Sequence, residues 1–149
     1  MKKFSMVFLS AIILIFTSCK FDGDGFITDT DYQYQKKANQ IVNELISSIE
    51  NKKENNIATV FAKTVSANTE EFEESVSALM DYYTGNMVSC NSEYEPYSSG
   101  VYTPERTCEY IYCSYSVTTD KSDYYFYLKI VTRDTVNADN IGIYSLYVI

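Results

Sequence analysis

The stretch that decides the fold runs from Glu109 to Thr132 and reads EYIYCSYSVTTDKSDYYFYLKIVT. Apolar and polar side chains alternate in both of its halves, which is the period of a β-strand. One face carries Ile111, Cys113, Tyr115, Val117, Tyr124, Phe126, Leu128 and Ile130. The other face carries Tyr110, Tyr112, Ser114, Ser116, Tyr125, Tyr127, Lys129 and Val131. Thr119-Asp-Lys-Ser122 has the composition of a turn, so the stretch predicts a hairpin of strands Glu109–Thr118 and Tyr124–Thr132.

Strands are expected on both sides of this hairpin. Eleven of the fifteen tyrosines lie between Tyr94 and Tyr147, among Val, Ile and Thr, and this composition favours sheet. The outer strands are expected at Asn86–Tyr94 and Ile141–Ile149. Glu95–Glu105 contains both prolines and Ser98-Ser-Gly100 and is expected to be a loop. The second half of the chain therefore predicts a four-stranded, mainly antiparallel sheet.

Three helices are expected before the sheet. Asp31–Glu50 places apolar residues three and four apart, and a shorter segment, Lys53–Lys63, does the same. The third helix starts at Asn68, whose capping-box partner is Glu71, and ends at Gly85. The expected fold is α+β, with the three N-terminal helices covering one face of a curved sheet and the covered face forming the core.

The N-terminus has the pattern of an exported lipoprotein. A basic start, Met1-Lys-Lys3, precedes an apolar run from Phe4 to Phe16, which at about 13 residues is short for the roughly 20 of a transmembrane helix. Phe16-Thr-Ser-Cys19 reads as a lipobox, in which Phe16 departs from the preferred Leu. We expect a signal peptide at 1–18, lipid on Cys19, a flexible tether to residue 30 and one domain at 31–149. An ordinary signal peptide, leaving a soluble secreted protein, is the alternative.

Charge limits the class of partner. The net charge is −8, and the first eighteen residues hold two lysines and no acids, so the mature chain is more acidic still. Nucleic acid is a poor partner for such a surface, because its phosphates select clustered Lys and Arg. The lipid on Cys19 would therefore hold the domain on the extracytoplasmic side of the cell membrane against mild repulsion from anionic headgroups.

Neither metal nor cofactor chemistry has a motif in this chain. There is no histidine, which excludes Ser-His and Cys-His pairs and His-containing zinc sites. Asp22-Gly-Asp-Gly25 resembles the start of a calcium loop, but the EF-hand positions for Gly and Glu hold Ile27 and Gln33. The acidic run Glu70, Glu71, Glu73 and Glu74 is explained by the dipole at a helix N-terminus. No metal or cofactor is expected.

Three cysteines follow Cys19 in a compartment where disulfides persist. Cys108 and Cys113 are five apart in one expected strand, so their side chains lie on opposite faces and should not pair. A bridge from Cys90 to one of them, or buried reduced thiols, are both compatible with the sequence.

Three stretches carry a resemblance to a known family: Asp81-Tyr-Tyr-Thr-Gly85, Val117-Thr-Thr-Asp-Lys-Ser-Asp-Tyr124 and Asn137-Ala-Asp-Asn-Ile-Gly-Ile-Tyr-Ser-Leu-Tyr147. Together with the order of the elements, they resemble an uncharacterised family of small bacterial lipoproteins. The family is similar in shape to the cone-like nuclear transport factor two fold. The resemblance covers nearly all of the mature chain and implies fold and localisation, with no catalytic residues to carry over.

An enzyme is one hypothesis for such a cone. Folds of this shape can hold a pocket in which an Asp base and a Tyr donor act on a carbonyl compound, as in ketosteroid isomerase-like enzymes. The candidates are Asp81 or Asp134 as base and Tyr83 or Tyr115 as donor, with Asp81, Tyr83 and Tyr115 as the candidate pocket. Acids at element ends are usually solvated and inward tyrosines are usually core, so the sequence favours binding over catalysis.

A binding module is the preferred hypothesis. Tyr110, Tyr112, Tyr125 and Tyr127 should lie together on the sheet face opposite the helices. Tyrosine supplies large contact area with few rotatable bonds, so this face is expected to meet a partner, either a second copy or a cell-envelope protein or glycan. Alternatively, the tyrosines stabilise the sheet, at roughly 0.2–1 kcal/mol per cross-strand pair. An immunity or inhibitor lipoprotein is also compatible with the sequence.

Overall fold

The computed structural model describes residues 29–68, 72–94 and 96–149. The expected signal peptide, Cys19 and most of the tether lie outside the described residues, as do Glu70 and Glu71. Within the described ranges, no helix combines the length and apolar character needed to cross a membrane.

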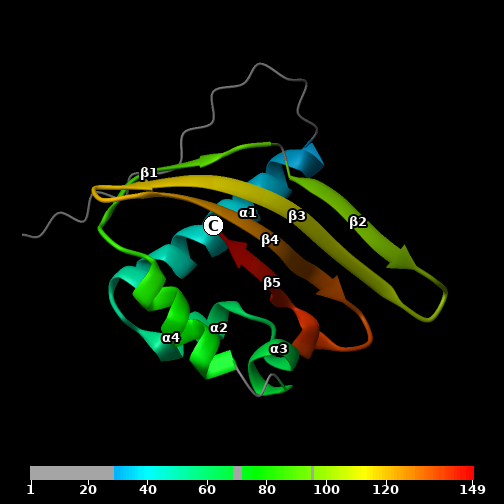
Figure 1. Ribbon diagram of the computed structural model, residues 1–149. Coiled ribbons are helices and arrows are strands. Elements are labelled where there is room, and N and C mark those ends of the chain that lie inside the picture. The colour runs from blue at the N-terminus through cyan, green and yellow to red at the C-terminus, as the bar shows by residue number, and fades with distance from the viewer. Residues whose placement is uncertain (1–28, 69–71, 95) are drawn as a thin grey trace, which may run out of the picture.

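An open antiparallel sheet of five strands forms the second half of the molecule (Figure 1). Its strands are β1 Met87–Ser92, β2 Tyr97–Tyr102, β3 Thr107–Thr119, β4 Asp123–Asp134 and β5 Gly142–Val148. The strand order is β1-β3-β4-β5, and β2 also pairs with β3. The predicted hairpin is confirmed as β3 and β4, joined where the turn was expected.

The prediction of four strands was wrong, because β2 lies where a loop was expected. Tyr97, Val101 and Tyr102 favour a strand, and the whole of β2 pairs with the first half of β3. The two prolines, which suggested a loop, stand just outside this strand at 96 and 104. Proline is tolerated there, since it removes no hydrogen bond from the strand interior.

The described residues form four α-helices where three were predicted. They are α1 Asp29–Glu50, α2 Glu54–Val60, α3 Lys63–Asn68 and α4 Phe72–Tyr82. The predicted second helix, Lys53–Lys63, is interrupted because Phe61 adopts an extended backbone and forms a parallel bridge with Ile143 of β5. Asn68 ends α3, whereas it was expected to cap the next helix.

Gly85 has a different role from the helix stop predicted for it. Helix α4 ends earlier, at Tyr82, and Gly85 has φ +87°, in the left-handed region that favours glycine. A Cβ at Gly85 would overlap the side chains of Thr119 and Asp120 in the β3–β4 turn. The glycine therefore lets the start of β1 approach the hairpin, where the Asn86 amide donates to Asp120 Oδ1 over 2.8 Å.

The core lies between the helices and one face of the sheet. All eight residues predicted on the inward face of the hairpin are buried. The long helix α1 packs against them through Ala38, Val42, Leu45, Ile46 and Ile49. Burial of each large apolar side chain stabilises the fold by about 1.5–3 kcal/mol. Val131 is the exception to the predicted faces: it is buried, and β4 changes register with both neighbours close to it.

The cysteines follow the reduced alternative. Cys108 and Cys113 carry free thiols, so the other alternative, a bridge from Cys90 to one of them, is not formed. Cys113 lies in the core, and burial raises the pKa of its thiol to about 12. It acts as a small apolar residue there.

Candidate functional site

A groove rich in tyrosine lies on the sheet face opposite the helices. Its volume is about 510 Å³, which is within the range of small-ligand sites in proteins. We call it the tyrosine groove and define it by the residues that line it: Tyr94, Tyr97, Tyr112, Cys113, Ser114, Tyr127, Leu128, Lys129, Ser145, Leu146 and Tyr147.

Strand register builds this groove from residues far apart in the sequence. One row across the sheet runs from Tyr97 of β2 through Tyr112 and Lys129 to Ser145 of β5. The neighbouring row joins Ser114, Tyr127 and Tyr147. Because side chains alternate between the faces of a strand, both rows point away from the helices, as the sequence pattern predicts for Tyr112 and Tyr127.

The tyrosine rings hold one another in place along the groove. Tyr97 stacks on Tyr112 with 4.9 Å between ring centres and an angle of 20° between ring planes. Tyr110 meets Tyr112 edge to face at 5.6 Å, and Tyr127 meets Tyr147 at 6.4 Å. Such pairs add roughly 0.5–1.5 kcal/mol beyond area burial, so the rings are preorganised. Tyr97 and Tyr147 remain 62% and 64% exposed, which leaves much of their surface open to a ligand.

Lys129 places a positive charge among these rings. Its Nζ lies 4.3 Å from the centre of the Tyr110 ring, 5.7 Å from that of Tyr112 and 5.3 Å from that of Tyr144. Ring faces attract a cation without neutralising it. The ion pairs seen among the described residues involve Lys63, Arg106 and Arg133, so no carboxylate of the described chain pairs with Lys129.

Of the four tyrosines predicted to form a binding face, Tyr112 and Tyr127 line the groove and Tyr110 contacts both Tyr112 and Lys129. Tyr125 is exposed but lies outside the groove lining. Sequence reasoning missed Tyr97 because its strand was taken for a loop. It placed Lys129 on the correct face, but nothing in the sequence pattern marks a lysine as surrounded by rings.

The residues of the predicted catalytic pocket do not converge. The Tyr83 hydroxyl donates to Glu50 Oε1 over 3.3 Å, whereas the Tyr115 hydroxyl donates to Asn39 Oδ1 over 2.7 Å. Asn39 and Glu50 are about 16 Å apart along α1. Burial, and then Glu50, raise the pKa of Tyr83 well above its usual range. Asp81 is exposed at the end of α4. These groups do not form a shared acid–base site.

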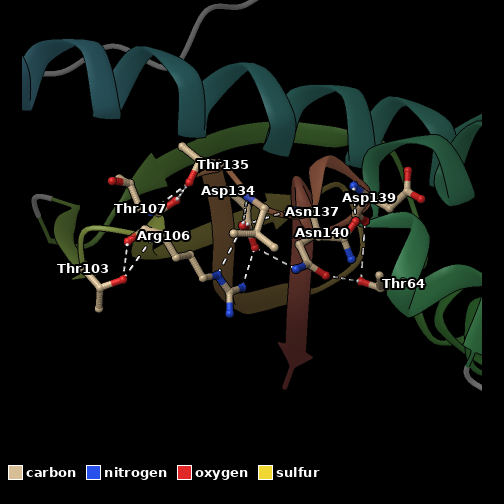
Figure 2. A network of polar contacts seen from close by, with 10 residues as sticks. Thr64, Thr103, Arg106, Thr107, Asp134, Thr135, Asn137, Asp139 and Asn140 are labelled. Carbon is tan, nitrogen blue, oxygen red and sulfur yellow. Dashed lines mark hydrogen bonds and ion pairs between the residues drawn. The ribbon is translucent and has the colours of Figure 1, made fainter.

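Asp134, the other candidate base, is fully engaged inside the protein. Figure 2 shows Arg106 and Asn140 reaching its carboxylate from either side. Arg106 donates from Nη2 at 2.6 Å and from Nε at 3.3 Å, and Asn140 Nδ2 donates at 2.8 Å. The backbone amides of Val136 and Asn137 donate to Oδ1 as well. Arg106 first, and then Asn140, hold the pKa of this carboxyl well below its usual range. It is therefore a poor proton acceptor and serves to hold the end of β4.

Acidic residues do not gather into a metal site in the part of the chain that the structure describes, where no group of three or more Cys, Asp, Glu or His side chains is placed to bind an ion. Glu73 and Glu74 stand exposed in the first turn of α4. Negative charge is favourable there because the helix N-terminus carries partial positive charge. Their position agrees with the structural role expected for them.

Most of the chain matches the model of a known protein family. A family model described as a domain of unknown function (DUF5104) matches residues 44–149. The match begins inside α1 and includes the whole sheet, and therefore the tyrosine groove. No curated protein matches the chain.

Proposed function

The chain belongs to the DUF5104 family of domains of unknown function, and from this premise we propose that it is a lipid-anchored binding domain whose tyrosine groove holds an acidic sugar of the cell envelope. The observation that carries the proposal is the ring-lined groove with Lys129 among its lining residues, the Nζ of which lies 4.3 Å from the centre of the neighbouring Tyr110 ring.

The anchor is supported by the sequence pattern that ends at Cys19. A diacylglyceryl group on this sulfur would hold the protein at the membrane, because each buried methylene contributes roughly 0.8 kcal/mol. Helix α1 begins at Asp29, so about ten residues of chain would separate lipid and domain, or at most roughly 35 Å when extended. An anchored domain of this kind would lie on the extracytoplasmic side, within reach of envelope glycans. We also propose that the domain has the cone-like shape that the family resemblance implies.

A sugar suits the surfaces that the groove offers. Pyranose rings combine an apolar C–H face with hydroxyl groups around the rim. The exposed faces of Tyr97 and Tyr147 match the apolar face, and their phenolic groups with Ser114 and Ser145 can donate to and accept from the rim hydroxyls. Most small-ligand sites have this composition, apolar and aromatic walls with a few polar groups that orient the ligand.

Lys129 adds a preference for a carboxylate. Its ammonium group has no acidic partner among the described residues. A ligand carboxylate would complete a charge-assisted hydrogen bond, which is roughly twice as strong as a neutral one. Among envelope sugars, those with a carboxyl substituent, such as N-acetylmuramic acid, present this group beside an apolar ring face.

Catalysis has less support than binding. The enzyme hypothesis needs a carboxylate able to accept a proton beside a tyrosine donor, and Asp134 is held as an anion by Arg106 while Tyr83 and Tyr115 are tied to separate parts of α1. Binding of a second copy or of an envelope protein to the tyrosine face stays a prediction. The geometry of the groove does not favour either of them over a glycan.

The proposal is tested by titrating the protein with two disaccharides that differ in one substituent. N-acetylglucosaminyl-N-acetylmuramic acid carries a lactyl carboxylate, and N,N′-diacetylchitobiose does not. Preferential binding of the first, lost on replacing Lys129, supports the proposal. If the protein binds neither sugar, the proposal is contradicted.

A further inference from the structure

Strand β5 forms one edge of the sheet, next to β4 (Figure 1). Tyr125 and Ile149 exchange two backbone hydrogen bonds, Tyr125 N to Ile149 O over 2.9 Å and the reverse over 3.1 Å. Bonded and non-bonded pairs alternate along an antiparallel ladder. The next non-bonded positions of β5 are Val148 and Leu146, opposite Phe126 and Leu128. The amide and carbonyl groups of Val148 and Leu146 therefore point away from β4, toward the open edge.

An apolar groove of about 630 Å³ runs beside this edge, between β5 and the helices. We call it the edge groove. It is lined by Phe61, Val65, Phe72, Ser75, Val76, Ala78, Leu79, Tyr82, Tyr144, Ser145, Leu146, Tyr147 and Val148. None of the lining residues that the structure describes is charged, although the chain as a whole is strongly acidic. An occupant of this groove should be an uncharged, apolar segment.

The opposite edge of the sheet is protected against strand pairing, whereas β5 is not. On the opposite edge, β1 and β2 are short and separate, Pro96 precedes β2, and β1 has an irregular pairing after Met87. Short strands, prolines and bulges are the devices by which proteins blunt an edge. Beyond one irregularity near Tyr144, β5 pairs regularly with β4 to its end and contains neither charge nor proline.

Pairing along the β5 edge has already begun within the chain. Phe61 forms a parallel bridge with Ile143, and the Ala62 amide donates to the Ile143 carbonyl over 3.0 Å. Helix α3 starts at Lys63, so the segment Phe61-Ala62 turns away from β5 after this single bridge. The edge can therefore accept a strand, and no described segment of the chain pairs with the outer side of Ser145 to Val148.

We propose that a second copy of this chain occupies the edge, with its β5 antiparallel to the first around a two-fold axis at Tyr147. In this register Leu146 of each copy lies opposite Val148 of the other, and the two pairs exchange four backbone hydrogen bonds. The occupant meets the chemical requirement of the edge groove, because β5 is itself uncharged and carries Ile143, Leu146 and Val148 on its inner face.

The pairing has a consequence for the outer face. Tyr147 lines both grooves, so β5 separates the edge groove from the tyrosine groove. In a two-fold pair the two sheets would become continuous, and both tyrosine grooves would lie on the same side. Two linked sites on one repetitive ligand bind more tightly than either site alone. Pairing at β5 does not depend on the sugar proposal, because it uses the backbone groups at the strand edge and needs no sugar in the tyrosine groove.

Disulfide cross-linking of the full-length chain in intact cells tests the pairing. Across the two-fold axis the Tyr147 positions of two copies face each other as a non-bonded pair, with Cα atoms about 4.5 Å apart, close enough for a disulfide. Tyr147→Cys should therefore give a covalent dimer on treatment with copper phenanthroline. The exposed Tyr125→Cys is the matched control, and the wild type measures any background from Cys108.

Two substitutions on α4 locate the contact. Ala78 lines the edge groove and Ser77 is exposed beside it without lining the groove. Ala78→Lys in the Tyr147→Cys background should lower the cross-linked fraction about tenfold or more, because it buries an unpaired charge, whereas Ser77→Lys should not change it. No dimer above the Tyr125→Cys level overturns the proposal. A dimer that is insensitive to Ala78→Lys, or that is abolished by Tyr112→Ser, places the contact elsewhere and overturns it as well.

Discussion

The Nζ atom of Lys129 lies 4.3 Å from the centre of the Tyr110 ring, on the sheet face that the helices leave uncovered. Tyr110 is on β3 and Lys129 on β4, and the rings of Tyr112 and Tyr144 lie within 5.7 Å and 5.3 Å of the same nitrogen. The lysine is thus held over the sheet by rings from β3 and β5. This arrangement makes the outer face a defined site with a charge at a fixed position.

Removing tyrosines from the groove should weaken binding. Replacing both Tyr112 and Tyr127 with Ser removes two of the rings that line the groove. Aromatic residues of this kind often contribute about 2 kcal/mol or more to binding, so the affinity for the ligand should fall about tenfold or more. Calorimetric titration with the acidic disaccharide measures the change. Tyr125→Ser is the control, since Tyr125 is exposed on the same strand but does not line the groove. Equal losses in both variants would count against the groove as the site.

Asp134→Asn should destabilise the fold in a pH-dependent way. The folded state holds the pKa of this carboxyl below its unfolded value of about 3.9, because Arg106 and Asn140 bind the anion. The stabilisation is therefore complete above that unfolded value, shrinks as pH falls below about 4, and is lost when pH reaches the lowered pKa. Urea unfolding of both proteins at pH 7 and pH 3.5 should show a larger difference at pH 7. A difference that is independent of pH would refute the charged role of Asp134.

The Cys113 thiol should resist alkylation in the folded protein. Burial raises its pKa to about 12, so almost no thiolate is present at pH 8.5, and only 8% of the residue is exposed. Cys108 is partly exposed and should react first with iodoacetamide. Peptide mass spectrometry with and without urea distinguishes the two. Rapid labelling of Cys113 without denaturant would show that the core opens readily or is packed differently.

Acylation at Cys19 should decide where the protein is found. Cys19→Ala should leave an uncleaved precursor or a soluble form, since the sulfur that carries the lipid is gone. Fractionation of cells and mass spectrometry of the mature N-terminus measure this. A mature wild-type protein that begins at another residue, with no lipid, would mean that the segment is an ordinary signal peptide.

Sequence alone predicted the parts of the fold that depend on local periodicity. The eight inward residues of the β3–β4 hairpin alternate with outward ones, and the apolar residues of α1 recur every three or four positions. The eight hairpin residues are buried as expected, as are Ala38, Val42, Leu45, Ile46 and Ile49 of α1. β2 could not be predicted because its strand character depends on pairing with β3, and Ser98, Ser99 and Gly100 have turn composition in isolation. The break between α2 and α3 depends likewise on a distant bridge from Phe61 to Ile143.

The candidate site was predicted in part. Alternation alone puts Tyr110, Tyr112 and Tyr127 on one face, and the structure adds Tyr97 and Tyr147 through cross-strand register. Register also decides which residues surround Lys129, and it cannot be read from a single strand. For Asp134 the sequence suggested a catalytic base that the structure does not support. Arg106, 28 residues away in the sequence, pairs with this carboxylate and holds it as a buried anion.

The central claim is that Lys129 in the tyrosine groove binds the carboxylate of an acidic sugar. One calorimetric comparison tests this claim directly. Wild type, Lys129→Met and the exposed control Lys121→Met are each titrated with N-acetylglucosaminyl-N-acetylmuramic acid and with N,N′-diacetylchitobiose. A hydrogen bond to a charged group contributes about 1.5–3 kcal/mol, so Lys129→Met should lower affinity for the acidic sugar at least about tenfold and leave the neutral sugar unchanged. Equal affinity of the wild type for the two sugars, or an acidic-sugar affinity that survives Lys129→Met, would contradict the account.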